Sequence, residues 1–200
     1  MGSDKAWLEW AGSTLLGHTC DVLAAAVSGP VVVVRSAGQH LPAMPPEVRA
    51  VEDPRPRLGP LQGLAAGLAE AARQEADVAF VAATDLPLLA PAVVRRIVAT
   101  LVEPDGPAGP PWEIALPVVS GEWQPLAAAY RTALARSAQS DVVDGRLSVR
   151  RFAGSRRVRL LTESDLLADD RVAADDPDLR SFVNVNEERE LARVRAASRG

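Results

Sequence analysis

The residue whose place in the sequence points most directly to chemistry is Asp85, which follows an apolar run at residues 78–83. This run is too short for a helix, so it predicts a strand that is buried on both faces, as in a parallel sheet. A carboxylate at the carboxyl end of such a strand lies where open α/β sheets bind ligands, because the loops there diverge into a crevice. Asp85 is therefore a candidate catalytic or ligand-binding residue. The alternative is that it caps a helix beginning near Pro91, a common role of aspartate in such turns.

A second carboxylate and a glycine-rich loop are further candidates for the same site as Asp85. Asp53 follows a short segment at 48–51 that predicts another strand, so both carboxylates come after strands. The loop that follows contains Gly59 and Gly63 and leads into a helix rich in alanine and leucine at 64–72. Glycines in such a loop allow the backbone to approach a ligand closely. The alternative is that they allow tight packing of the helix on the sheet.

Two carboxylates, a glycine loop and Lys5 together suit a magnesium-bound nucleotide. Mg²⁺ takes oxygen ligands, usually one or two carboxylates together with phosphate oxygens, and Lys5 would neutralise phosphate charge. Zinc chemistry is not indicated, because His18, His40 and Cys20 lack the spacing of zinc ligands. Catalysis by a serine triad is not indicated either, because the chain has no nucleophile elbow.

These residues depend on a framework in which strands and helices alternate. Such alternation implies right-handed crossovers, a mostly parallel sheet and helices on both of its faces. We therefore predict the α/β class, with a three-layer, doubly wound, Rossmann-like sheet in one domain over residues 1–200. The predicted strands are 31–34, 48–51, 78–83, 113–119, 158–161 and 181–185, and the predicted helices are 15–26, 64–72, 91–101, 124–138, 148–152 and 187–197.

Length and composition limit the classes of protein to which the chain can belong. Its 200 residues suit an α/β domain with a sizeable core. The formal net charge of -4 argues against a general nucleic-acid or anionic-membrane surface, although small anionic ligands remain compatible with it. One cysteine excludes a disulfide framework. The charged N-terminus and the short apolar runs do not fit a secretory signal or a membrane span. We expect a cytoplasmic protein that binds neither nucleic acid nor membrane.

Six short motifs occur in order along the whole chain. They are Met1-Gly-x-Asp4-Lys5, Glu52-Asp53, Gly59-Pro-Leu-x-Gly63, Thr84-Asp85-x-Pro87, Gln124-Pro125-Leu126 with Tyr130, and Phe182-Val-Asn184-Val-Asn186. In this order they resemble the molybdenum cofactor guanylyltransferases. The first and the last motif favour this family over the similar cytidylyltransferases of molybdopterin and over sugar-nucleotide enzymes.

The resemblance implies an enzyme that joins GTP to the phosphate of a molybdenum-bearing pterin on Mg²⁺, giving the guanine dinucleotide cofactor and pyrophosphate. By residue match, Lys5 would hold the GTP phosphates, Asp85 would ligate Mg²⁺, and these two would be the catalytic residues. Asp53 would help to seat the guanine nucleotide. The implied partners are GTP, the molybdenum–molybdopterin cofactor and maturation proteins of molybdoenzymes. The other residues that would line the shared crevice are Gly2, Gly59, Gly63, Asn184 and Asn186.

The chain departs from the family at two places. Ser36 lies near the position of a family asparagine, so it is the candidate for that nucleotide contact. Family members also carry a buried strand and a Leu-x-Gly-Gly-x-Ser-x-Arg loop directly before Met-Gly-x-Asp-Lys, whereas this sequence begins at that methionine. We therefore expect a start assigned too far downstream or a truncated chain, in which residues 1–12 lack an anchor.

Two alternatives to an active guanylyltransferase follow from these departures. The first is an inactive relative that binds a pterin or a partner protein. The second is a nucleotidyltransferase of the same fold that uses another nucleotide or acceptor, as in cytidylyl transfer or transfer to a sugar phosphate.

Overall fold

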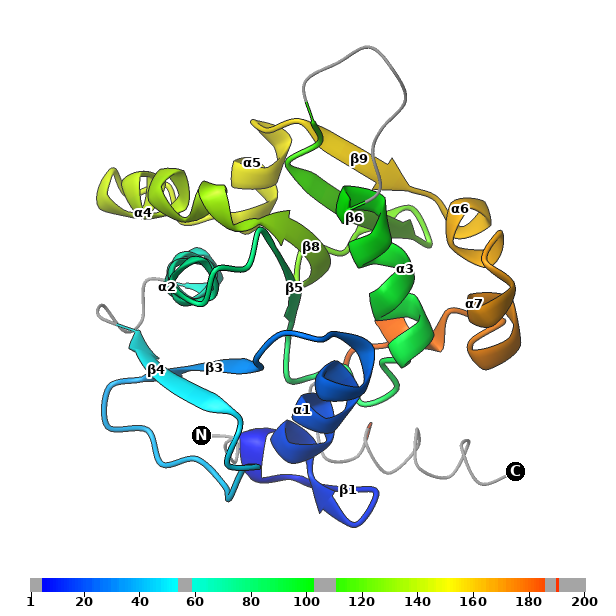
Figure 1. Cartoon of the computed structure of the whole chain (residues 1–200), viewed down its shortest axis with the longest axis horizontal. Helices are drawn as coiled ribbons and strands as arrows, with labels where there is room; N and C mark the ends of the chain where they lie inside the picture. The colour runs from blue at the N-terminus through cyan, green and yellow to red at the C-terminus, as the bar shows by residue number, and fades with distance from the viewer. Residues whose placement is uncertain (1–4, 54–58, 103–110, 186–189, 191–200) are drawn as a thin grey trace.

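The computed structural model of this chain describes residues 5–53, 59–102, 111–185 and 190, and Figure 1 shows how the elements are arranged. Strands and helices alternate along much of the chain, which confirms the predicted α/β class. None of the helices in the described parts is both long and apolar enough to cross a membrane. The strands are β1 (Glu9–Trp10), β2 (Ser13–Thr14), β3 (Val32–Ser36), β4 (Arg49–Asp53), β5 (Val78–Ala82), β6 (Ile114–Val119), β7 (Glu122–Trp123), β8 (Ala127–Arg131) and β9 (Val158–Leu161). The helices are α1 (Leu15–Ala26), α2 (Pro60–Arg73), α3 (Pro91–Val102), α4 (Ala135–Val143), α5 (Val149–Gly154), α6 (Glu163–Leu167) and α7 (Asp170–Asp175), with the 3-10 turns η1 (Lys5–Trp7), η2 (Thr132–Leu134) and η3 (Arg180–Phe182).

The main sheet is mixed rather than mostly parallel. Its strand order is β5-β8-β6-β7, and β9 pairs with β6. β8 runs antiparallel to both β5 and β6, whereas β9 runs parallel to β6. The direction of β8 follows from the short connection after β6, which turns tightly at Ser120 and Gly121, both with positive φ. A parallel return would need a crossover of about a dozen residues or more, and this connection is too short for one.

The segment 124–138, predicted to be one helix, is the strand β8 followed by η2 and the start of α4. Ala127 and its neighbours to Tyr130 are all 2% exposed or less, so β8 is buried on both faces. Such a strand shows no polar alternation, and alanine favours helices, so the local pattern pointed to the wrong element. The predicted strand 181–185 is also wrong, because η3 occupies its beginning. The predicted helix 187–197 lies outside the described residues except for Glu190.

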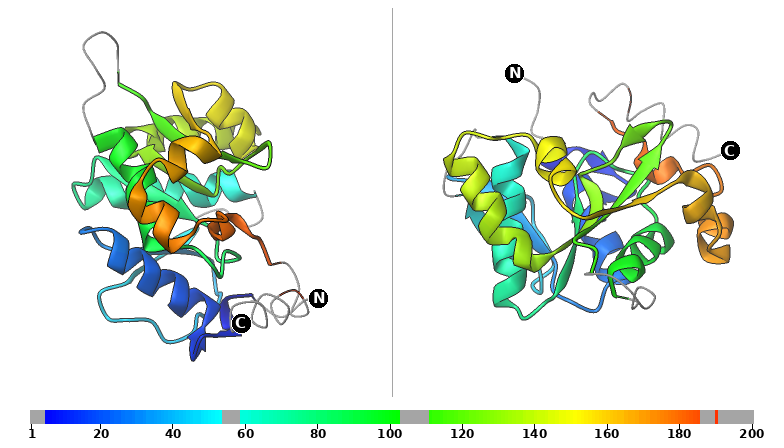
Figure 2. Two further views of the ribbon diagram at one scale, coloured as in Figure 1. Left: turned by 90° about the vertical axis from the view of Figure 1, so that its right-hand side faces the viewer. Right: turned by 90° about the horizontal axis from the view of Figure 1, so that it is seen from above.

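Helices cover both faces of the main sheet, as the three-layer prediction requires (Figures 1 and 2). α2, α4 and α5 pack on one face, and α3, α6 and α7 pack on the other. The alternating side chains of β8 connect the two cores. Ala128 and Tyr130 belong to the cluster formed with α2 and α4, whereas Ala127 and Ala129 belong to the cluster formed with α3.

β3 and β4 form a separate parallel pair in which Ser36 lies opposite Asp53. The structure pairs β3 only with β4, and β5 only with β8, within the described residues. The predicted single sheet is therefore interrupted between β3 and β5. All residues of β5 are half-buried, so the prediction of a strand buried on both faces is wrong. An apolar groove along its open edge accounts for this exposure.

The N-terminal segment packs on α1. Ala6 belongs to a buried cluster with Leu16, and Trp10 is buried against Leu15 and Val185. The prediction that residues 1–12 lack an anchor is therefore wrong for the described part of that segment. This packing places Lys5 next to the carboxyl end of β5.

Candidate functional site

Lys5 and Asp85 meet at the carboxyl end of β5. Lys5 Nζ lies 3.3 Å from Asp85 Oδ2, and 36% and 24% of the two side chains are exposed. The backbone at Asp85 is held as well, because its carbonyl accepts a hydrogen bond of 2.9 Å from the Val185 N–H. The structure thus brings together the two residues that the resemblance assigned to catalysis.

The second carboxylate oxygen of Asp85, Oδ1, is buried and has no hydrogen-bond partner among the described residues. Leaving such an atom without a partner costs about 1–3 kcal/mol, so it is a natural acceptor for a ligand or a cation. In the part of the chain that the structure describes, the Asp85 carboxylate accepts no backbone N–H, so Asp85 does not cap α3. The Ala90 N–H just before α3 instead donates to Ser181 Oγ at 2.9 Å. The capping alternative is therefore wrong.

A cavity of about 340 Å³ opens beside this pair. It lies at the carboxyl ends of β3 and β5, because Val34 and Thr84 both border it. Its polar groups come from Lys5, Asp85, Thr84 and Gln39, and apolar side chains close the rest. This location agrees with the general rule that open α/β sheets bind ligands beyond the carboxyl ends of their strands. The complete lining is Lys5, Ala6, Leu16, Val33, Val34, Gln39, Leu41, Thr84 and Asp85.

Ser36 is joined by hydrogen bonds to Gln39, which lines this cavity, whereas neither Ser36 nor Asp53 lines it. Ser36 is exposed, Asp53 is half-buried, and the two are opposite each other at the ends of β3 and β4. The Ser36 N–H donates to Gln39 Oε1 at 3.1 Å, and the Gln39 N–H donates to the Ser36 carbonyl at 3.0 Å. Because Gln39 also lines the cavity, the turn at Ser36 forms its rim. Asp53 lies on β4, which is farther from Lys5 and Asp85 than β3 is, because, of these two strands, only β3 contributes residues to the cavity lining.

Three residues that sequence reasoning did not assign to the site shape it. Arg35 Nη1 donates to the Gln39 carbonyl at 2.8 Å and Nη2 pairs with Glu52 Oε1 at 2.7 Å, so Arg35 holds the turn that carries Gln39. His18 Nε2 lies 3.1 Å from the Pro87 carbonyl oxygen and fixes the turn after Asp85. The only available signal was that Arg35 and Gln39 flank a small-residue turn after a strand.

Gly59 and Gly63 belong to the beginning of α2 and do not border this cavity. Gly59 precedes the helix with φ 81°, a backbone region that favours glycine, and Pro60 occupies the first helical turn. Gly63 lies inside α2, and a Cβ added there would meet no atom within 4 Å. Gly63 lines the larger apolar groove that adjoins the cavity. The structure therefore places neither glycine in the Lys5–Asp85 cavity, and only Gly63 in the groove that adjoins it.

Asn184 is exposed and directly precedes Val185, whose N–H is bonded to the Asp85 carbonyl. The segment that carries Asn184 is thus attached to the same turn as Asp85. The other residues predicted to line the crevice, Gly2 and Asn186, lie outside the described residues.

The donor set at Asp85 limits how a metal ion could bind. Among the described residues there is no group of three histidine, cysteine, aspartate or glutamate side chains that could enclose a cation. An ion at Asp85 would therefore take most of its ligands from a substrate or from water. Mg²⁺ typically binds in this way, through one or two carboxylates and phosphate oxygens.

Comparisons with known proteins show which family and which solved structures this chain is similar to. The model of the MobA-like NTP transferase domain matches residues 1–159. A probable molybdenum cofactor guanylyltransferase of Mycobacterium tuberculosis (strain ATCC 25618 / H37Rv) is 34% identical over 188 residues, which cover 93% of this chain and 82% of that protein. The fold is similar to that of molybdopterin-guanine dinucleotide biosynthesis protein A from Archaeoglobus fulgidus, with a TM-score of 0.72, 18% identity, and coverage of 100% of this chain and 93% of the other. A manganese complex of Rv0371C from Mycobacterium tuberculosis H37Rv aligns with a TM-score of 0.50 and 20% identity, over 80% of this chain and 82% of the other.

Proposed function

Because this chain belongs to the family of MobA-like NTP transferase domains and is a nucleotidyltransferase of the molybdenum cofactor guanylyltransferase type, we propose that it transfers GMP from GTP to the molybdenum–molybdopterin cofactor. A phosphate oxygen of the pterin attacks the α-phosphorus of GTP, and the bond between the α-phosphorus and the bridging oxygen breaks. The products are the guanine dinucleotide cofactor and pyrophosphate. The observation that carries this proposal is the contact of 3.3 Å between Lys5 and Asp85 beside a cavity at the carboxyl ends of β3 and β5.

Asp85 is the residue that would hold a divalent cation, and we infer Mg²⁺. Its buried Oδ1 has no partner among the described residues, and its Oδ2 has only the ammonium of Lys5. The manganese complex of Rv0371C adds support from a protein of similar fold. When bound, such a cation would neutralise phosphate charge at the reacting centre and at the departing pyrophosphate.

Lys5 would bind the triphosphate of GTP. Its side chain is 36% exposed and lines the cavity, so a phosphate can reach it without rearrangement of the core. In the absence of nucleotide, Asp85 neutralises it. A bound nucleotide and cation would supply charges of opposite sign to each member of the pair, which would separate the two side chains at little electrostatic cost.

The other substrate contacts are assigned by position. We infer that Ser36 and Asp53, paired at the ends of β3 and β4, contact the nucleoside, because Ser36 is bonded to Gln39, which lines the cavity. We infer that Asn184 contacts the acceptor, because the next residue, Val185, is bonded to the Asp85 carbonyl. The further contacts that we propose for the nucleotide and the pterin are Gly2, Gly59, Gly63 and Asn186.

The test is a transfer assay with molybdenum–molybdopterin, Mg²⁺ and either GTP or CTP. We expect pyrophosphate and a guanine dinucleotide, both detected by mass spectrometry, with GTP only, and we expect neither after chelation of the metal. If a product formed only with CTP, the activity would be cytidylyl transfer and the proposal of guanylyl transfer would be wrong. Binding of the pterin without pyrophosphate release under any condition would identify an inactive relative.

A further inference from the structure

Two walls of the cavity beside Lys5 come from segments that are far apart in the sequence. Lys5 and Ala6, in the 3-10 turn η1, form one wall, and Gln39 and Leu41, in the loop after β3, form the other. A ligand that fills the cavity lies between these two segments. Its binding therefore depends on how firmly the protein holds them at a fixed spacing before the ligand arrives.

A hydrogen bond from Trp7 joins the two walls. The indole Nε1–H of Trp7 donates to the carbonyl of His40 at 3.1 Å. Trp7 ends the same 3-10 turn that carries Lys5, and His40 lies in the chain between the two loop residues that line the cavity. The bond therefore ties the turn that carries the ammonium to the opposite wall, across 33 positions of the sequence.

The loop residue before His40 is held from the other side by Arg35. Arg35 Nη1 donates to the Gln39 carbonyl at 2.8 Å, and Gln39 Oε1 accepts the Ser36 N–H at 3.1 Å. Two successive carbonyls of the loop, those of Gln39 and His40, thus accept hydrogen bonds from β3 and from η1. These two anchors fix the backbone at Gln39, where the loop has no helix or strand to hold it.

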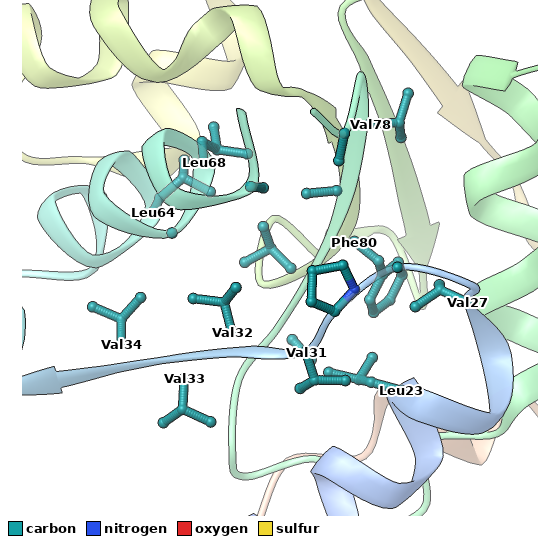
Figure 3. Close-up of a pocket in the computed structure, with 18 of the residues that line it drawn as sticks. Leu23, Val27, Val31, Val32, Val33, Val34, Leu64, Leu68, Val78 and Phe80 are labelled. Carbon is teal, nitrogen blue, oxygen red and sulfur yellow. The ribbon is translucent and has the colours of Figure 1, made fainter. Parts of the chain in front are cut away.

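Apolar packing holds η1 against β3. Ala6 belongs to a buried cluster against which Val33 packs. Figure 3 shows that Val33 points to the opposite side of β3 from Val32 and Val34, which point toward α2. The turn η1 is thus seated on one side of β3, and α2 covers the other.

Trp7 itself contributes little to the core. It is 50% exposed, and among the described residues it neither borders the cavity nor belongs to a buried cluster. A tryptophan side chain has a single hydrogen-bond donor, the indole N–H, and here that donor binds the loop. The effect of Trp7 on a ligand is therefore indirect and acts through the position of the loop.

We propose that Trp7 is a positioning residue for the nucleotide, because its hydrogen bond to His40 holds the loop that carries Gln39 at the spacing from Lys5 that fits the triphosphate. This inference rests on the proposed function, since it concerns the same cavity and GTP as its ligand. Without the indole N–H, the two walls separate more freely, and the nucleotide must order them as it binds. Binding of GTP then weakens, whereas the transfer step is kept because Lys5 and Asp85 are unchanged.

The first experiment measures the loop directly, by hydrogen–deuterium exchange in residues 36–41. Trp7→Phe keeps an aromatic ring but lacks the N–H, whereas the neutral imidazole of Trp7→His offers an N–H at a similar reach. Exchange should be about three- to tenfold faster in Trp7→Phe than in the parent protein, and largely restored in Trp7→His. Exchange in β9, which pairs with β6, is the internal reference. Equal exchange of the loop in parent and Trp7→Phe, or a rise of the same size in β9, overturns the proposal.

The second experiment separates GTP binding from transfer. With the molybdenum–molybdopterin cofactor and Mg²⁺ at saturation, Trp7→Phe should raise KM for GTP about three- to tenfold and leave kcat within about twofold of the parent value. Trp112→Phe is the matched control, because Trp112 stacks with Arg157 and does not border the cavity. It should change neither constant. A fall in kcat with KM unchanged, or the same rise in KM in both variants, overturns the role of Trp7.

Failure of the proposed function gives a different result. If the parent protein transfers no GMP, that function is wrong, and the GTP concentration that half-protects Lys5 from acylation then replaces KM as the measure of binding. A half-protecting concentration that rises about three- to tenfold in Trp7→Phe still supports the role of Trp7. An unchanged concentration, or no protection by GTP even in the parent, overturns it.

Discussion

The ammonium of Lys5 lies 3.3 Å from the carboxylate of Asp85, although 80 positions separate the two residues in the sequence. Their side chains are 36% and 24% exposed, so water screens their attraction, and such a pair contributes about 0–1 kcal/mol to stability. The pair is therefore better suited to binding a charged ligand than to holding the fold. The buried second oxygen of Asp85 supports the same conclusion.

Replacing Asp85 by asparagine should reduce nucleotidyl transfer by at least about 100-fold while the protein stays folded. The amide keeps the shape of the side chain but loses the charge that would hold a divalent cation. Transfer and Mn²⁺-dependent GTP binding are the measurements. Asp77→Asn is the matched control, because Asp77 precedes the same strand at its opposite end and is exposed. Equal losses in both variants would contradict the role of Asp85.

Lys5 is the only lysine of the chain, which allows a direct chemical test of its role. An amine-acylating reagent should modify its side chain in the free protein, and GTP with Mg²⁺ should protect it. Peptide mapping separates this site from the terminal amine. Lys5→Ala should lower kcat/KM for GTP by about tenfold or more, whereas Lys5→Arg should keep part of it, because the charge remains but its geometry differs. If GTP with Mg²⁺ left the labelling of Lys5 unchanged, Lys5 would not bind the phosphates of GTP.

The two glycines at the start of α2 should respond to alanine in opposite ways. Gly59 has φ 81°, so Gly59→Ala should cost about 1 kcal/mol of unfolding free energy. Gly63 lies inside the helix, and an added Cβ meets no atom within 4 Å, so Gly63→Ala should stabilise by about 0.5–1 kcal/mol. Urea unfolding measures both. If a substrate approaches Gly63 closely, Gly63→Ala should raise KM despite its greater stability, and an unchanged KM would leave Gly63 without a substrate contact.

Tyr130 makes a buried contact whose loss should be measurable. Its hydroxyl donates to the Pro125 carbonyl at 2.6 Å, and its side chain is fully buried. Tyr130→Phe keeps the packing but leaves the carbonyl without this donor, so unfolding free energy should fall by about 1–2 kcal/mol. Urea titrations of the variant and the parent protein give the difference. No change in the midpoint would mean that water replaces the hydroxyl.

The single cysteine predicts a pH dependence. Burial, with a smaller contribution from the charge of Asp21, raises the pKa of the Cys20 thiol from 9.0 to about 11. The folded state thus holds this proton more tightly than the unfolded chain does. The resulting stability is complete below about pH 9 and is lost as the pH rises toward about 11.

Cys20→Ala isolates this effect, because the variant lacks the thiol while other groups that titrate at high pH remain. Unfolding free energy measured between about pH 8 and pH 10.5 should fall more steeply in the parent protein than in Cys20→Ala. Parallel curves would show that the thiol titrates alike in the folded and unfolded states.

Elements with a strong local signal were predicted correctly. The helix at 15–26 and the strand at 158–161 agree with α1 and β9 within a residue. α1 has a clear cap, because Thr14 accepts the Gly17 N–H. β9 is a short segment of Val158, Arg159 and two leucines that ends where Thr162 caps α6. The failure at β8 has the opposite cause, because an alanine-rich segment buried on both faces carries no periodic pattern that separates strand from helix.

The sequence by itself determined the α/β class and the position of Asp85 after a strand, because short-range chain stiffness and apolar patterning decide where strands end. It also determined the family, through motifs that keep their order. Only the tertiary structure decided which strands lie next to each other. Paired strands are far apart in the sequence, so no local sequence pattern shows which strands pair. The contact between Lys5 and Asp85, the turn held by Gln39 and the groove between β3 and β5 all arise from this long-range arrangement.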